Sequence, residues 1–132
     1  MGLDNGIKIK RRADLPAAAF AYFDEEWRAK NNYDLEVAYW RKCWNVRRII
    51  IDVLDVREDN DSCTAMTIDD VDAVITALCK INKKTWLDYG STIWDWEEFK
   101  GIQRRNIRNL RRLRYMMRKK PEVFEVYFYD SW

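Results

Sequence analysis

The residues best suited to hold a ligand are aromatic rings placed beside cations in one short stretch of the chain. They are Tyr39, Trp40, Arg41, Lys42 and, three residues further on, Asn45. A tyrosine or tryptophan ring can stack on a planar base, and arginine or lysine can pair with a phosphate group. This combination predicts a binding site for a nucleotide-like small molecule.

Two further patches can join this site if the fold brings them near it. Gly90, Ser91 and Thr92 form a tight loop that offers hydroxyls and backbone N–H groups, and Trp132 adds a ring at the end of the chain. The opposing interpretation is structural. In it the tryptophans are core residues, the cations pair with acidic residues between positions 52 and 72, and the triplet merely begins a helix. The sequence leaves both interpretations open.

A basic run between positions 104 and 120 is the second candidate. It holds nine arginines and lysines and no acidic residue. Such a run can bind a polyanion such as nucleic acid, or an acidic protein partner. Its charges also spread over most of the circumference of a helix, as they do on a solvated surface. The residues assigned to this polyanion or protein interface are Arg104, Arg105, Arg108, Arg111 and Arg112.

Catalytic and metal chemistry have little support in the sequence. The chain contains no histidine, the side chain most often used as general base and as zinc ligand. Cys43, Cys63 and Cys79 show no CxxC spacing, and the acidic segment 58–61 lacks the glycine and the terminal glutamate of an EF-hand loop. We therefore expect a protein that is not an enzyme and that has neither a metal site nor a cofactor.

Composition indicates one globular domain over residues 1–132. Apolar residues make up 48% of the chain, and seven Trp, seven Tyr and five Phe supply large surfaces to bury. The odd number of cysteines argues against a disulfide framework, and no apolar run approaches the roughly 20 residues that cross a bilayer. These features predict a cytoplasmic protein that does not enter a membrane.

The longest apolar-periodic segment is 34–54, which contains the aromatic and basic residues described first. Val37, Trp40, Trp44 and Ile51 recur there at steps of three, four and seven residues, the spacing of one helix face. Asp34 can serve as its N-cap. We therefore expect one continuous helix over this whole segment.

The remaining elements are expected from periodicity and capping signals. Thr67 with Asp70, and Asp95 with Glu98, resemble capping boxes. The predicted strands are 7–12, 63–67 and 122–132, the two further helices are 67–82 and 95–120, and the segment 17–27 suits either state. This order indicates an α+β fold, in which a small antiparallel sheet that includes the N- and C-terminal strands packs with three helices. The aromatic-rich terminal strands are also compatible with a homodimer.

Several of these pieces together resemble a family of small proteins from bacteriophages and prophages. Its members open with MGLDM, carry YWRKAN on a helix, have a GST-containing aromatic loop and end with SSW. The corresponding residues are 1–4, 39–42, 90–92 and 131–132, in the same order along nearly the whole chain. The family continues YWRK with Ala-Asn and a later histidine, whereas this chain has Cys43-Trp44-Asn45 and no histidine. Any role of that histidine is lost here or taken by Arg47 or Arg48.

The resemblance implies a phage-related origin and brings no settled activity. Combined with the aromatic and basic residues, it leads us to expect a stoichiometric binding protein that antagonises a host defence in the host cell cytoplasm. Such a protein either sequesters a nucleotide-like ligand or binds a defence protein directly. The alternative is a nucleic-acid-binding accessory protein that uses the basic helix 104–120.

Overall fold

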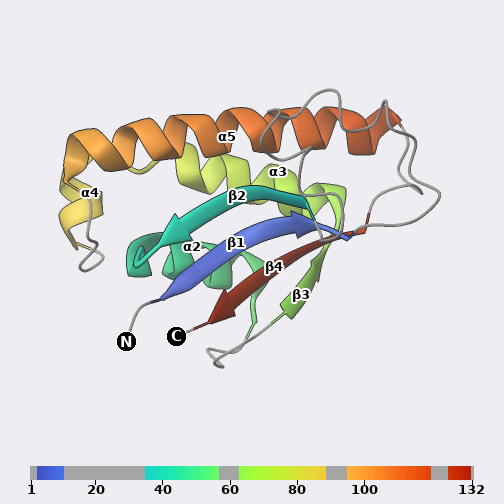
Figure 1. Ribbon diagram of the computed structural model, residues 1–132, viewed down its shortest axis with the longest axis horizontal. Coiled ribbons are helices and arrows are strands. Elements are labelled where there is room, and N and C mark those ends of the chain that lie inside the picture. Colours follow the sequence, from blue (N-terminus) through green and yellow to red (C-terminus); the bar gives the residue numbers. More distant parts are fainter. Residues whose placement is uncertain (1–2, 11–34, 57–62, 89–94, 120–124, 132) are drawn as a thin grey trace.

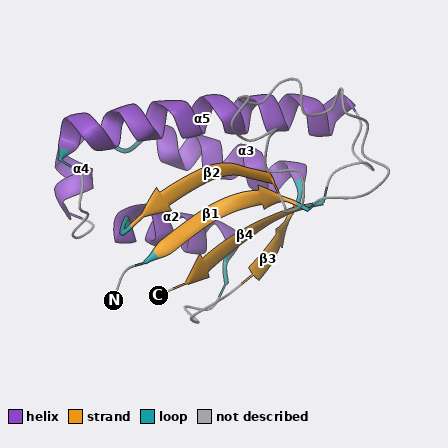
Figure 2. Cartoon of the chain, viewed as in Figure 1, coloured by secondary structure: helices purple, strands orange, loops and turns teal. Residues whose placement is uncertain are grey.

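The computed structural model describes residues 3–10, 35–56, 63–88, 95–119 and 125–131. These segments form an α+β fold of four strands and four helices (Figures 1 and 2). The elements are β1 (Asp4–Ile9), β2 (Leu35–Arg41), α2 (Trp44–Leu54), β3 (Cys63–Met66), α3 (Ile68–Cys79), α4 (Lys83–Asp88), α5 (Trp96–Lys119) and β4 (Val126–Ser131). Segment 17–27, the triplet at 90–92 and residue 132 lie outside the described residues.

The four strands form one antiparallel sheet in the order β2-β1-β4-β3. The N-terminal and C-terminal strands are neighbours at its centre, where Ile7 pairs with Phe128. The expected antiparallel sheet that contains both terminal strands is therefore confirmed. Strand β1 begins at Asp4, earlier than expected, because Asn5-Gly6 belongs to the strand and not to a turn.

Gly6 explains why a turn-like pair of residues lies inside a strand. A Cβ atom at this position would lie 2.5 Å from the Ala38 carbonyl oxygen and 2.9 Å from Cε1 of Tyr129. The neighbouring backbone and the tyrosine ring thus approach more closely than any side chain would permit, which is one of the uses of glycine in a strand.

The expected continuous helix over 34–54 is wrong. Its first part is strand β2, and α2 begins only at Trp44. Lys42 has a left-handed backbone conformation, with φ of 53°, which ends the strand and turns the chain into the helix. A shift in register between the pairs Ile7–Ala38 and Lys8–Glu36 makes Val37 an extra residue, as in a β-bulge. Val37 and Ala38 are therefore both buried, which hides the two-residue period of a strand.

Helices α3 and α5 form close to where their capping signals place them. The Thr67 side chain accepts from the backbone N–H of Asp70, and the Asp70 side chain accepts from the backbone N–H of Thr67. Asp95 likewise accepts from the backbone N–H of Glu98 at 2.8 Å. These bonds satisfy N–H groups that a helix start leaves without partners. The short helix α4 was not expected from the sequence.

Helices α2, α3 and α5 lie on one side of the sheet and form a second layer, whereas α4 lies beyond the end of the sheet near the start of α5 (Figure 1). Helix α2 contacts α3, α3 contacts α5, and α5 contacts β2. The core between the layers contains fully buried strand residues such as Ile7, Trp40 and Phe128, and helix residues such as Val74 and Leu110. No helix within the described residues is long and apolar enough to cross a membrane.

Candidate functional site

The five residues predicted to form an aromatic-basic site lie between the end of β2 and the start of α2. Tyr39 and Trp40 are consecutive in a strand and therefore point to opposite faces of the sheet. Trp40 is fully buried, and its indole N–H donates to Oε1 of Gln103 at 2.7 Å. For Trp40 the structural interpretation holds, because a ring enclosed in the core has no face left for a ligand.

The other three residues of this group have different environments. The Arg41 side chain is exposed, and Lys42 is half-buried. The backbone N–H of Lys42 donates to the Leu3 carbonyl at 2.5 Å, which ties the bend to the start of β1. Asn45 is buried, and its Oδ1 accepts from the backbone N–H of Val46 at 2.9 Å. These residues are near one another along the chain, but their side chains differ in exposure, from the exposed Arg41 to the buried Asn45.

The strand register brings the start of β1, the end of β2 and the end of β4 together. Asn5 pairs with Trp40 on one side and with Asp130 on the other. Because directly paired residues share a face of the sheet, these three side chains point toward the helices. Asn5, Trp40 and Asp130 thus form a buried row across three neighbouring strands.

A buried ion pair lies in this row. Nε of Arg47 on α2 donates to Oδ2 of Asp130 at 2.7 Å, and the two side chains are 5% and 0% exposed. Sequence reasoning did not select Asp130, although a signal was present. Val126, Phe128 and Asp130 occupy alternate positions of an interior strand, and a carboxylate at a core-facing position requires a cation beside it. The pair anchors α2 to the sheet and is closed to solvent.

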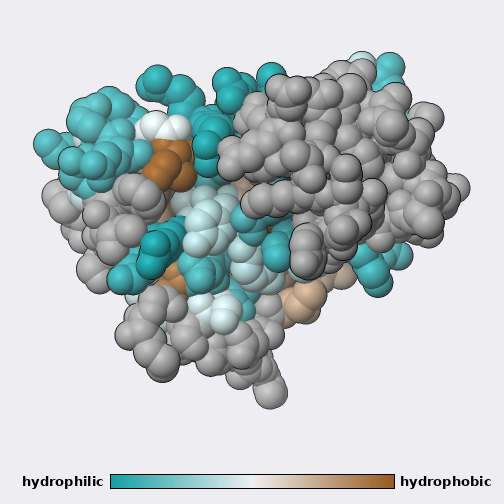
Figure 3. Space-filling model, in the orientation of Figure 1, coloured by the Kyte–Doolittle hydropathy of each residue, from teal (hydrophilic) through white to brown (hydrophobic). Residues whose placement is uncertain are grey.

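The opposite face of the sheet carries tyrosines bonded to carboxylates. The Tyr39 hydroxyl donates to Oδ1 of Asp4 at 2.5 Å, and the Tyr129 hydroxyl donates to Glu36. Burial, followed by the hydrogen bond to the carboxylate, raises the pKa of both tyrosines well above the ordinary value. Lys8 lies over the Tyr129 ring, 4.4 Å from its centroid. Figure 3 looks onto this face, where hydrophilic and intermediate side chains predominate.

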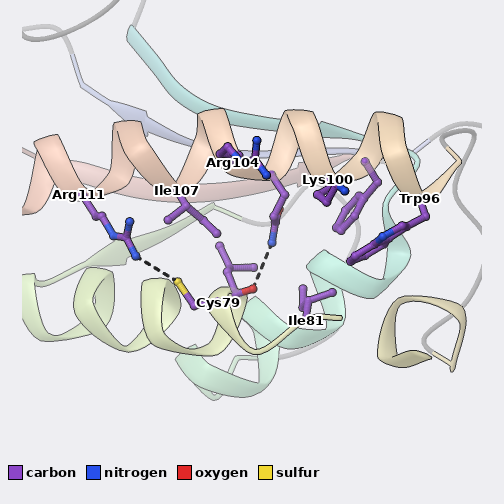
Figure 4. Close-up of a pocket in the computed structure, with 10 residues that line it drawn as sticks. Cys79, Ile81, Trp96, Lys100, Arg104, Ile107 and Arg111 are labelled. Carbon is purple, nitrogen blue, oxygen red and sulfur yellow. Dashed lines mark hydrogen bonds between the residues drawn. The ribbon is translucent and has the colours of Figure 1, made fainter. Parts of the chain in front are cut away.

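An open groove lies on the other side of the molecule, between α5 and the end of α3 (Figure 4). Its volume is about 250 Å³. The floor is built from buried or half-buried side chains of both helices, namely Leu78, Phe99, Gln103 and Ile107, and the remaining lining residues are Cys79, Ile81, Trp96, Lys100, Arg104 and Arg111. The groove therefore combines a mainly apolar floor, in which Gln103 is the polar member, with a cationic rim.

The cationic side chains that line the groove differ in whether a carboxylate neutralises their charge. Lys100 pairs with Glu97 at 3.0 Å. Nη2 of Arg111 donates to Sγ of Cys79 at 3.6 Å, a contact that spans the groove (Figure 4). Within the described part of the chain, neither Arg104 nor Arg111 has a carboxylate within ion-pair distance. These two guanidinium groups keep their positive charge unneutralised beside an apolar surface.

The two ends of the groove differ, with aromatic rings at one end and ion pairs at the other. At one end the rings of Trp86, Trp96 and Phe99 form a cluster with centroid separations of 5.9 to 6.1 Å. At the other end, Nη1 of Arg114 pairs with Asp72 at 2.5 Å, and Arg118 lies 3.9 Å from the same carboxylate. Two arginines of the basic run thus share one acidic residue of α3 at this end of α5.

The five arginines predicted as an interface differ in their position relative to the groove. Arg104 and Arg111 line the groove, whereas Arg105 and Arg108 are exposed outside its lining and Arg112 is half-buried. Sequence reasoning missed the groove itself. Its one available signal was the seven-residue spacing of Arg104 and Arg111 with Ile107 between them, which places all three on one helix face.

The described residues contain no cluster of three or more Cys, Asp or Glu side chains arranged to hold a metal ion. Comparison of the sequence with protein-family models and with curated proteins, and of the structure with solved structures, finds no match.

Proposed function

We propose that this protein is a stoichiometric binding protein that holds a nucleotide-like anion in the groove between α3 and α5. The observation that carries the proposal is the pair Arg104 and Arg111, two guanidinium groups without a carboxylate partner among the described residues, above an apolar floor. The proposed site differs from the one expected from the sequence, because Trp40 is enclosed in the core.

Charge and shape together favour an anion with an apolar part. A guanidinium group forms paired hydrogen bonds with phosphate oxygens, and these bonds are stronger next to a low-dielectric surface than in open water. Ligand pockets for drug-sized molecules commonly have volumes of roughly 300–1,000 Å³. At about 250 Å³, the groove suits a small ligand that remains partly in solvent.

The biological role that we attach to this site comes from the resemblance to phage and prophage proteins. A protein that binds a nucleotide-like signal and performs no reaction on it lowers the free concentration of that signal. We propose that it antagonises a host defence in this way, in the host cell. Direct binding of a defence protein is the other route to the same role, and it needs an exposed surface instead of the groove.

A thermal-shift experiment on the purified protein tests the proposal. Mono-, di- and cyclic nucleotides are each added in excess, and a ligand at about 100 times its Kd stabilises the folded state by about 2.7 kcal/mol. We expect at least one class to raise Tm, and we expect the rise to disappear in the double variant Arg104→Ala/Arg111→Ala. Lys119→Ala removes a charge from the exposed end of the same helix and should preserve the rise. The absence of a shift with every nucleotide would contradict the proposal.

A second candidate function is nucleic-acid binding along α5. It is favoured by Arg105 and Arg108, which are exposed and have no carboxylate partner within the described residues. Binding of this kind weakens steeply as salt is added, because counterions released from the phosphates must be recaptured. Charge reversal at Arg105 and Arg108 should abolish binding to oligonucleotides and leave binding of a mononucleotide in the groove unchanged.

A further inference from the structure

We infer that the groove binds its ligand in one direction, with a planar ring at the Trp96 end and a linear chain of anionic groups running toward Arg111. This inference rests on the proposed function and narrows its ligand class to ring-bearing polyphosphates such as nucleoside di- and triphosphates. It follows from the order in which chemically different side chains lie along α5.

The ring end is defined by Trp96 and Ile81. Both are half-buried and line the groove, so part of each surface remains accessible. Trp96 is held in place from behind by Trp86 and by the fully buried Phe99. A fixed indole beside an aliphatic side chain offers a flat apolar surface, on which a planar base can stack without reorganising the protein.

Unneutralised positive charge increases along α5 from the Trp96 end of the groove toward Arg111. Lys100 shares its charge with Glu97, whereas Arg104 and Arg111 have no such partner among the described residues. With a rise of about 1.5 Å per residue, Arg104 lies roughly 6 Å beyond Lys100, and Arg111 lies roughly 10 Å beyond Arg104. An extended chain of two or three phosphates is needed to reach from the first arginine toward the second.

The increase in unneutralised positive charge along α5 ends at Arg114, which pairs with Asp72. One turn beyond Arg111, the next cation on the groove side of α5 is already neutralised at 2.5 Å. An anionic chain therefore gains more attraction from Arg111, which has no carboxylate partner among the described residues, than from Arg114. A ligand bound in the reverse direction would place its ring against two unneutralised guanidinium groups and its phosphates against Trp96, and it would lose both interactions.

Calorimetric titration with adenosine and with its mono-, di- and triphosphates tests this direction. Each further phosphate that reaches an arginine should tighten binding, and a charged hydrogen bond of about 1.5–3 kcal/mol corresponds to roughly tenfold or more in Kd. We expect the triphosphate to bind most tightly. We expect Arg111→Ala to weaken the triphosphate roughly tenfold and to leave the monophosphate within about twofold of its wild-type Kd.

Three controls separate the ring from the phosphates. Inorganic triphosphate tests the anionic end alone, and decyl phosphate tests whether an aliphatic tail replaces the ring. Trp96→Leu keeps an apolar side chain and removes the indole, so it should weaken every adenosine ligand by a similar factor and leave inorganic triphosphate unchanged. If Trp96→Leu does not fold, the phosphate series in the wild type and in Arg111→Ala still decides the direction.

Different results would overturn the direction in which the ligand binds and the proposed function itself. Equal affinity for mono- and triphosphate, or an equal loss for both in Arg111→Ala, would overturn the direction while the proposed function stands. Decyl phosphate binding as tightly as adenosine monophosphate would overturn the assignment of the ring end. Failure of every nucleotide to bind the wild-type protein would overturn the direction and the proposed function together.

Discussion

At the scale of single residues, Arg47 and Asp130 form the interaction most sensitive to substitution. Their side chains are 5% and 0% exposed, so removing one partner leaves the other charge buried without this ion pair. Such a change typically costs about 3–5 kcal/mol of stability. We expect Arg47→Met and Asp130→Leu each to lower the free energy of unfolding by this amount in denaturant titrations.

The double variant Arg47→Met/Asp130→Leu should recover a large part of this loss, because it removes both charges together and replaces them with apolar side chains. Lys119→Ala, an exposed position on α5, is the control and should change the free energy of unfolding by less than about 0.5 kcal/mol. Single variants that match this control would show that the buried pair does not stabilise the fold.

Tyr39 and Tyr129 make stability depend on pH on the alkaline side. Burial and hydrogen bonds to carboxylates raise the pKa of both hydroxyls in the folded state, whereas an unfolded tyrosine ionises at about 10. The folded state therefore retains protons that the unfolded state releases above that pH. By linkage, their contribution to stability is fully present below about pH 10 and falls as the pH rises further.

Denaturant titrations at about pH 9 and about pH 11, on either side of the pKa of an unfolded tyrosine, test this dependence of stability on pH. The wild-type protein should lose stability between them. The variant Tyr39→Phe/Tyr129→Phe should lose less, because it has no hydroxyl to ionise at these positions. An identical loss in both proteins would contradict the assigned pKa directions.

At the scale of elements, two glycines offer a matched comparison. Gly6 lies in β1, where a Cβ atom would meet the Ala38 carbonyl and the Tyr129 ring, whereas a Cβ atom at Gly101 in α5 would meet nothing within 4 Å. We expect Gly6→Ala to destabilise the protein by about 1–3 kcal/mol. Gly101→Ala should stabilise it by about 0.5–1 kcal/mol, because alanine favours the helix. Thermal unfolding measures both, and equal effects would contradict the packing around Gly6.

The elements also show where sequence reasoning succeeds and where it fails. Helices α3 and α5 were predicted correctly because each begins with a local capping signal, at Thr67 and at Asp95. The segment 34–54 was predicted wrongly because a bulge at Val37 makes two consecutive residues buried. The resulting spacing imitates a helix period, and only pairing with a distant strand distinguishes the two.

At the scale of the whole molecule, the antiparallel sheet with both terminal strands was predictable, and the groove was not. Alternation of apolar residues marks the last strand without reference to the rest of the chain. The groove depends on how α3 packs against α5, which decides that Arg104 and Arg111 flank it while Arg114 meets Asp72. The same packing encloses Trp40 beneath Gln103. These contacts join residues that are far apart in the sequence, so no local pattern of residues reveals them.

The most direct test of the binding site is a two-dimensional NMR titration of the labelled protein with adenosine triphosphate. We expect saturable shifts with one ligand per chain. These shifts should cluster in amides of residues 78–81 and 96–111, and the amides of β1 and β4 should change little. Shifts that cluster instead at residues 39–45, or that fail to saturate, would contradict the assignment of the ligand to the groove between α3 and α5.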